Sequence, residues 1–276
     1  MPLPEALRSQ QRAEVGVFGG SGFYSLMEGP IEQVAVQTPY GPPSDTIGVG
    51  RFGDVRVAFL PRHGQHHRLP PHAINYRANL WAMAELGVSR VIAPAAAGSL
   101  RPGVKPGEFV VCDQFVDRTY GRAQTFFDGP RVVHISTAEP YCPELRHLAI
   151  ETGRELGIRM HERGTVVVIQ GPRFSTQAES RWFASQGWEV INMTQYPEVA
   201  LARELGLCYL NLSLITDYDA GLEGQPGITP VTVQEVLHVL HDNNQRVRHL
   251  IERLLPRIPA ARTCPCSRAL DHAVVS

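Results

Sequence analysis

The stretch Glu189–Gly221, EVINMTQYPEVALARELGLCYLNLSLITDYDAG, decides the fold class. Its Pro and Gly boundaries and its β-branched and aromatic runs predict three elements in succession. These are a short strand over Val190–Met193, a helix over Pro197–Leu205, and a second strand that ends near Thr216. Two strands joined by a helix normally lie parallel with a right-handed crossover, so the stretch predicts an α/β fold.

The predicted unit also places two acidic residues where ligands bind. Parallel strands end at one edge of a sheet, so Met193 and Thr194 would lie beside the triplet Asp217–Asp219 at the edge where open α/β sheets bind ligands. In extended backbone the side chains of Asp217 and Asp219 face the same side. Such a pair indicates either an acid–base site or a site that recognises the hydrogen-bond donors of a ligand. Alternatively, the two carboxylates only accept hydrogen bonds from turn amides.

Composition narrows the class of protein. The 276 residues are 43% hydrophobic and 19% charged, and no linker or repeat divides them, which predicts one globular domain. A net charge of −1 without a basic run argues against nucleic acid or a membrane surface as partner. The first residues lack the apolar core of a signal peptide and no apolar stretch is long enough to cross a bilayer, so the expected location is the cytoplasm.

The cysteines fall into two groups. Cys112, Cys142 and Cys208 lie in or beside apolar segments and are interpreted as ordinary buried thiols. Cys264 and Cys266 flank a proline near the C-terminus. Two thiols supply at most half of a structural zinc site, so no metal is expected there. The pair is interpreted as a redox pair or as part of an unused tail.

Small and polar residues cluster where other predicted strands end. A strand over Val15–Phe18 runs into Gly19–Gly22, whose amides and the Ser21 hydroxyl suit an anion. A series of predicted antiparallel hairpins then delivers Arg62 and His63 to a strand end. A guanidinium binds phosphate through a two-pronged fork, although Arg62 is equally interpretable as a surface residue.

Two further predicted strands end in similar clusters. The strand over Arg90–Ala97 leads into Gly98-Ser99, where backbone can approach a ligand closely. The continuous β-branched run Thr165–Ile169 predicts a strand buried on both faces, and it ends in the cluster Gln170–Phe174. Both clusters would join the same edge of the sheet.

The histidines give no convincing metal site. His66, His67 and His72 lie close in sequence, but no acidic residue or cysteine accompanies them at ligand spacing, so no metal is predicted. His134 is flanked by apolar residues, and a lone histidine in such a run is more typical of the core than of a catalytic site. The strand ends therefore combine an anion site, a pair of acids and apolar walls. Phosphorolysis of a nucleoside fits this combination.

The motifs GVFGGSGFY, TPYGPPSD, PRHGQHHRLPPHAINYRANLWA, AGSL, DQFVDRT, HISTAEPYC, GPRFST, INMTQYPEVALARELGLCY and TDYDAG occur in this order. Together they resemble the methylthioadenosine phosphorylase branch of the purine nucleoside phosphorylase family over residues 14–257, leaving 1–13 and 258–276 as terminal tails. The resemblance implies a single α/β domain with a central mixed sheet flanked by helices, a homotrimer, and no metal or organic cofactor. It implies a reaction of 5′-methylthioadenosine with phosphate, the co-substrate, to give adenine and 5-methylthioribose 1-phosphate.

The resemblance also assigns roles to individual residues. The phosphate contacts it implies are Ser21, Arg62, His63, Ala96 and Thr194. The nucleoside contacts it implies are Met193 under the sugar, Phe174 against the purine, Thr216, Asp217 and Asp219 at the base, His134 from a neighbouring subunit, and Val233 and Val236 around the 5′ substituent. In one departure from the family, Ala95 lacks a hydroxyl that close relatives direct at phosphate.

The proposed catalytic residues are Asp217 and Asp219. Asp217 would hold the proton for purine N7, with its pKa raised by burial and by the second carboxylate. Asp219 would accept a hydrogen bond from the 6-amino group, which favours adenine over a 6-oxopurine. The alternatives are a phosphorylase of 6-oxopurine nucleosides or of other 5′-substituted, for example halogenated, adenosines, a nucleosidase that uses water, and a non-catalytic nucleotide-binding module.

Overall fold

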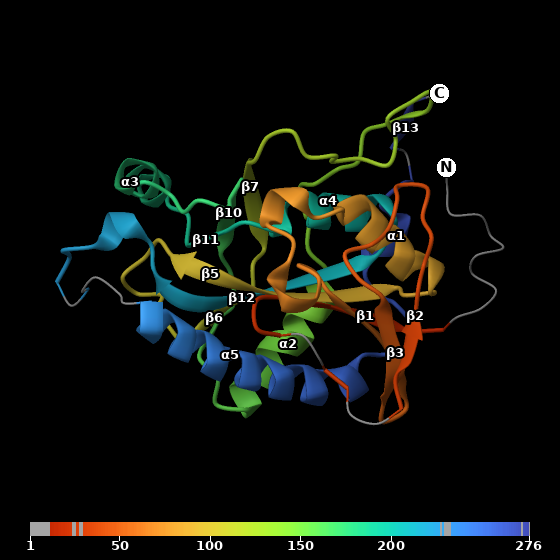
Figure 1. Ribbon diagram of the computed structural model, residues 1–276, viewed down its shortest axis with the longest axis horizontal. Coiled ribbons are helices and arrows are strands. Elements are labelled where there is room, and N and C mark those ends of the chain that lie inside the picture. The colour runs from red at the N-terminus through yellow and green to blue at the C-terminus, as the bar shows by residue number, and fades with distance from the viewer. Residues whose placement is uncertain are drawn as a thin grey trace.

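The chain folds into three layers, with helices covering both faces of one mixed sheet (Figure 1). The single α/β domain with a central mixed sheet that the sequence predicts is confirmed. The computed structural model describes residues 12–23, 26–27, 30–226, 228, 233–271 and 273–275, without the side chains of residues 233–236 and 275.

The bounds of the elements follow the chain. The strands are β1 (Val15–Gly19), β2 (Glu32–Val34), β3 (Ile47–Phe52), β4 (Val55–Pro61), β5 (Arg90–Ser99), β6 (Phe109–Val110), β7 (Gln114–Arg118), β8 (Val132–Val133), β9 (Met160–His161), β10 (Thr165–Ile169), β11 (Val190–Asn192), β12 (Cys208–Tyr218) and β13 (Val274–Val275). The helices are α1 (Tyr76–Glu85), α2 (Pro143–Glu155), α3 (Gln177–Ser185), α4 (Gln195–Glu204) and α5 (Val233–Leu254). Short single turns are η2 (Gln65–His67), η3 (Pro71–Ala73), η4 (Ala220–Leu222), η5 (Leu255–Arg257) and η6 (Pro265–Arg268).

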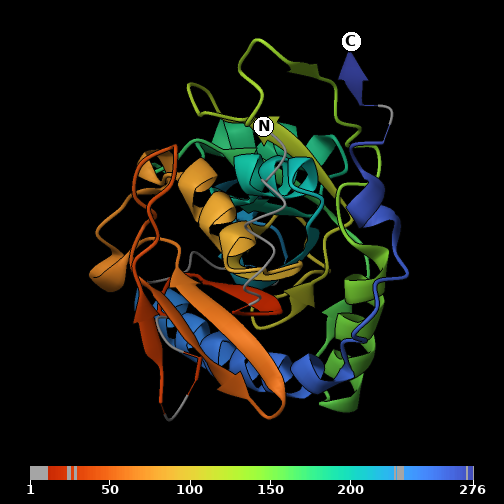
Figure 2. The same cartoon turned by 90° about the vertical axis from the view of Figure 1, so that its right-hand side faces the viewer.

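Strand β5 is the centre of the sheet. β12 pairs with it in parallel along its whole length, from Cys208 opposite Arg90 to Tyr218 opposite Ser99. On its other edge β5 pairs first with β1, in parallel, and then with β11, in antiparallel. The predicted antiparallel hairpins at the start of the chain are confirmed as β2–β3–β4, which stand at the lower left of Figure 2.

The predicted parallel pairing of the two strands around α4 is wrong. β11 and β12 lie on opposite edges of β5, and β11 runs antiparallel to β5 while β12 runs parallel to it. β11 occupies the part of β5 that β1 leaves free, because β1 pairs with Arg90–Ile92 only. The hydrophobic pattern of a strand shows that it is buried but not the direction of the strand beside it. The right-handed crossover rule applies to parallel strands, and β11 and β12 are antiparallel and separated by β5.

Two apolar cores lie on the two faces of the sheet. Helices α1 and α4 cover one face and contribute Leu80 and Val199 to its core. Helices α2 and α5 cover the other and contribute Leu145 and Leu250. The first nine residues of β12 are all buried, as expected for a strand that lies between two helical layers.

The chain continues past α5 as a packed segment. Cys264 and Cys266 are 8% and 5% exposed and belong to the core under α2 and α5. The interpretation of these residues as an unused tail is therefore wrong. Further on, β13 pairs with β8 in a separate ribbon. Within the described ranges, no helix combines the length and the apolar character that crossing a membrane requires.

Candidate active site

A cavity of about 720 Å³ opens where β1, β4, β5, β11 and β12 end. Its volume is in the range of sites for small organic ligands. Ten of the residues assigned to phosphate or nucleoside from the sequence line it, namely Ser21, Arg62, His63, Ala96, Phe174, Met193, Thr194, Thr216, Asp217 and Asp219. The antiparallel β11 thus still brings Met193 and Thr194 to the acidic end of β12.

The acidic end of the cavity is built on an irregularity of β12. Between Ile215 and Asp217 the pairing with β5 slips by one residue, so that Asp217 lies opposite Gly98. Such a bulge adds an unpaired residue and redirects the side chains that follow it. Thr216 is that residue, and its hydroxyl lies 2.5 Å from Asp217 Oδ1 and 3.3 Å from the carbonyl oxygen of Ala97.

The ionisation of Asp217 is shifted by its surroundings. Burial raises the pKa of Asp217 to about 6, the Thr216 hydrogen bond opposes this, and the Asp219 carboxylate adds to it. The direction and both causes agree with the expectation from sequence for this pKa. A carboxyl group with a pKa near 6 exists in both protonation states near neutral pH, as a proton donor requires.

Asp219 is held firmly in place. Its backbone amide donates to the Ser99 carbonyl at 2.9 Å, and Ser175 Oγ donates to its Oδ2 at 2.6 Å. A side chain at Gly98 would come within 3.6 Å of both carboxylate residues and 3.1 Å of Ile191 Cγ2. Glycine at this position therefore keeps the floor of the cavity open in front of the two acids.

The Arg62 guanidinium lies at the opposite end, and its fork is already occupied. Nε and Nη2 donate to the two Glu198 oxygens at 2.7 and 2.9 Å, and Nη1 donates to the Pro94 carbonyl at 3.1 Å. Arg62 is 1% exposed and Glu198 is fully buried. The Nε–Nη2 side of the fork is therefore occupied by Glu198, and contact of phosphate with the remaining N–H groups stays a prediction. Two of the five N–H groups of Arg62 remain for a ligand.

His63 lies beside Arg62 as a neutral imidazole. Burial lowers the pKa of His63 to about 4, although the hydrogen bond of Nδ1 with the Leu69 carbonyl, 2.9 Å long, acts in the opposite direction. Donation to this carbonyl assigns the proton to Nδ1 and leaves Nε2 as an acceptor. The His67 ring stacks on it at 4.0 Å.

The glycine loop after β1 packs against this end. A side chain at Gly20 would lie 3.1 Å from the Pro94 carbonyl oxygen and 3.7 Å from Arg62 Nη1. Asn244 of α5 donates to the Ser21 carbonyl at 3.0 Å and fixes the loop. Thr194 precedes α4 without using its hydroxyl as a cap, so this group is available to a ligand.

The mouth of the cavity is apolar. Phe174 is 78% exposed there, and Leu237 and Leu240 line it from α5. Val233 and Val236 each lie four residues, about one turn, before Leu237 and Leu240 on the same helix, and their side chains are outside the described residues. His134 is exposed on the β8–β13 ribbon and does not line the cavity, so its interpretation as a core residue is wrong.

Comparison with known proteins places the chain in a family. The profile of the phosphorylase superfamily matches residues 14–256. The chain belongs to this superfamily. It is 53% identical to the S-methyl-5′-thioadenosine phosphorylase of Pyrococcus furiosus, over 95% of this chain and 99% of that protein. It is 49% identical to the purine nucleoside phosphorylase of Streptomyces coelicolor, over 96% of each. The crystal structure of an adenosine/methylthioadenosine phosphorylase mutant from Schistosoma mansoni in complex with methylthioadenosine superposes with a TM-score of 0.83 at 37% identity, covering 91% of this chain and 93% of that one.

Three further residues of this phosphorylase site were not predicted from the sequence. Glu198 pairs with Arg62, and Ser175 holds Asp219. Asn192 is 5% exposed and lines the cavity, and neither end of its amide has a protein partner. A buried amide without partners is costly unless a ligand supplies them, so Asn192 is a further candidate ligand contact. In the sequence, Asn192 directly precedes Met193, which the resemblance places under the sugar, and this position could have indicated a ligand contact.

Proposed function

We propose that the chain catalyses the phosphorolysis of 5′-methylthioadenosine to adenine and 5-methylthioribose 1-phosphate. The observation that carries this proposal is the half-buried Asp217 carboxyl, with a pKa of about 6, which lines the same cavity as the two free N–H groups of Arg62 and the hydroxyl of Thr194. One end offers a proton and the other offers donors for an anion. The phosphorylase names of the relatives support the same reaction.

The reaction exchanges one bond at the sugar for another. A phosphate oxygen forms a bond to C1′ while the bond from C1′ to purine N9 breaks, and the bonding electron pair passes into the purine. Positive charge develops on the sugar and is stabilised by the adjacent phosphate. Asp217 supplies a proton at N7, so the base leaves as neutral adenine and the carboxylate regains its proton from solvent.

The choice of base follows from the second carboxylate. Asp219 keeps one oxygen engaged with Ser175 and has a second oxygen to accept a hydrogen bond from the 6-amino group. A 6-oxo group offers an acceptor at the same place and would face the carboxylate unpaired. The pair of acids therefore selects adenine.

The assembly and conditions are part of the same proposal. The proposed active form is a homotrimer in the cytoplasm, with phosphate and nucleoside as the only reactants and no organic cofactor. Phe174 and Leu237 leave apolar surface exposed at the mouth, which suits cover by a neighbouring subunit. In the trimer His134 of one subunit would reach the 5′ end of the nucleoside bound by another.

A rate panel tests the proposal. Adenine release is measured from 5′-methylthioadenosine and from a 5′-halogenated adenosine, and hypoxanthine release from inosine, each with and without phosphate. We expect release that depends on phosphate and is fastest with the 5′-substituted adenosines. Release without phosphate would indicate a nucleosidase. A higher kcat/KM for inosine would contradict the role assigned to Asp219. The inosine measurement is needed because one relative is named a purine nucleoside phosphorylase.

A further inference from the structure

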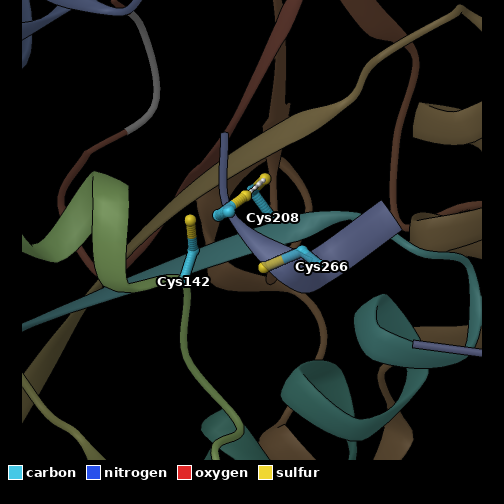
Figure 3. Close-up of side chains that lie close together, drawn as sticks. Cys142, Cys208 and Cys266 are labelled. Atoms are coloured by element: carbon cyan, nitrogen blue, oxygen red, sulfur yellow. Dashed lines mark hydrogen bonds between the residues drawn. The ribbon is translucent and has the colours of Figure 1, made fainter. Parts of the chain in front are cut away.

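Four cysteines meet outside the active-site cavity. The Sγ atoms of Cys142, Cys208, Cys264 and Cys266 all lie within 4.8 Å of one another, and all four residues are buried. Figure 3 shows the sulfur atoms of Cys142, Cys208 and Cys266 converging from three different elements. In the part of the chain that the structure describes, no other group of three or more histidine, cysteine or acidic side chains has the arrangement to hold a metal ion.

The four residues come from distant parts of the chain. Cys142 precedes α2, Cys208 is the first residue of β12, and Cys264 and Cys266 flank the start of η6. In the sequence, the pair near the C-terminus supplies only two ligands, so a metal is not expected there. The fold adds the other two ligands, which no spacing in the sequence indicates.

The spacing of the sulfur atoms matches a tetrahedral metal site. Zinc–sulfur bonds of about 2.3 Å place tetrahedral sulfur atoms about 3.8 Å apart. The six distances here are all below 4.8 Å, and Cys208 and Cys264 lie 3.3 Å apart. A disulfide would instead hold two sulfur atoms at about 2.05 Å. Each sulfur atom here faces three others, as a shared central ion requires.

We propose that these four cysteines form a structural zinc site. Each thiol loses its proton to solvent on binding, so four thiolates and one Zn²⁺ give a complex with a net charge of −2. Cys142 lies at the N-terminus of the 13-residue α2, where the helix dipole favours negative charge. Arg262 adds a cation nearby, fixed by its 2.8 Å hydrogen bond to the Gly206 carbonyl.

The surrounding contacts hold the site in shape. The Cys142 amide donates to the Tyr209 carbonyl at 2.9 Å, which ties the start of α2 to β12. Glu144 Oε2 accepts from the backbone amides of Thr263 and Cys264 at 3.1 and 3.2 Å, which fixes the segment that enters η6. The ion would therefore join α2, β12 and the C-terminal segment, and none of its ligands lines the active-site cavity.

The metal content of the full-length chain, purified without a polyhistidine tag and under reducing conditions, tests the site. Elemental analysis should find about one zinc ion per chain, and thiol titration after denaturation should find all 5 cysteines free. Replacing zinc by Co²⁺ should give the intense visible bands of tetrahedral thiolate coordination. Cys142→Ser and Cys266→Ser should each lower the zinc content at least tenfold. Cys112→Ser, a buried thiol 3.4 Å from Ser213 Oγ, is the matched control and should retain zinc.

Three results would overturn the proposal. The first is chain without metal that also fails to take up Zn²⁺ when titrated in reductant. The second is a mass lower by two hydrogens per bridge, which indicates disulfides among the four cysteines. The third is iron in place of zinc. The metal content, zinc uptake and mass of the wild-type chain test the proposal even if a cysteine variant fails to fold.

Discussion

The replacement Asp217→Asn should make the protein more stable while it removes most of the activity. The folded state holds this carboxyl with a pKa of about 6 in place of 3.8, so ionisation of Asp217 opposes folding at neutral pH. That difference corresponds to about 3 kcal/mol, of which solvent in the open cavity screens a part. Asparagine keeps an oxygen for the Thr216 hydroxyl and carries no charge. We therefore expect a gain of about 1–3 kcal/mol at pH 8.

The gain should depend on pH with a definite sign. Between about pH 4 and pH 6 the folded wild type binds more protons at Asp217 than the unfolded chain does, so its stability falls as pH rises through this window. The variant has no ionisable group at this position, so its stability lacks this dependence on pH. Its advantage should be near zero at pH 4, grow up to about pH 6 and then remain constant.

The assay combines unfolding with kinetics. Urea unfolding at fixed protein concentration gives the free energy of unfolding at pH 4 and pH 8, and adenine release gives kcat/KM. Turnover should fall by ~10²–10⁴-fold, and the fall of wild-type kcat/KM above about pH 6 should be absent from the variant. Asp54→Asn, an exposed carboxylate in the turn between β3 and β4, is the matched control and should change neither quantity. Equal stability of variant and wild type at pH 8, or unchanged turnover, would refute the assigned role.

Three further changes test the remaining parts of the cavity. Asp219→Asn should shift base preference toward inosine, and an equal loss on both substrates would contradict the assigned reading of the 6-position. Arg62→Ala should raise the phosphate KM by about 10-fold or more. It should also lower the free energy of unfolding by about 3–5 kcal/mol, because Glu198 is left buried without its cation. An unchanged phosphate KM in protein that remains folded would make Arg62 purely structural. Ala95→Thr should lower the phosphate KM, since it adds a hydroxyl at a lining residue, and isosteric Ala95→Val is its control.

The elements of the fold were largely predictable, but their partners were not. The β-branched run Thr165–Ile169 forms β10 with the predicted bounds, and the hairpin strands before Arg62 form as expected. Periodicity and turn residues are local signals and locate such elements well. The direction of β11 depends on which part of β5 is left unpaired by β1. That is a property of the assembled sheet and has no local signal.

The same distinction explains the errors at the candidate site. The lining residues could be predicted because they follow strand ends, where ligands of α/β proteins bind. The partner of Arg62 could not be predicted, because Glu198 lies 136 residues away and belongs to a helix that is buried on nearly all sides. The four-cysteine cluster combines residues up to 124 positions apart, since Cys142 and Cys266 come together only in the folded chain.

The two ends of the cavity act on each other through charge. The Glu198 carboxylate already offsets the Arg62 cation, and His63 is neutral at physiological pH because its pKa is lowered to about 4. Among the described residues that line the cavity, Arg62 is the only one with a permanent positive charge, so the field of a bound phosphate dianion extends across the cavity. Negative charge nearby favours the protonated form of a carboxyl group and raises its pKa. Phosphate binding should thus keep the proton on Asp217 at neutral pH, so the acid is best protonated in the complex in which N7 requires it.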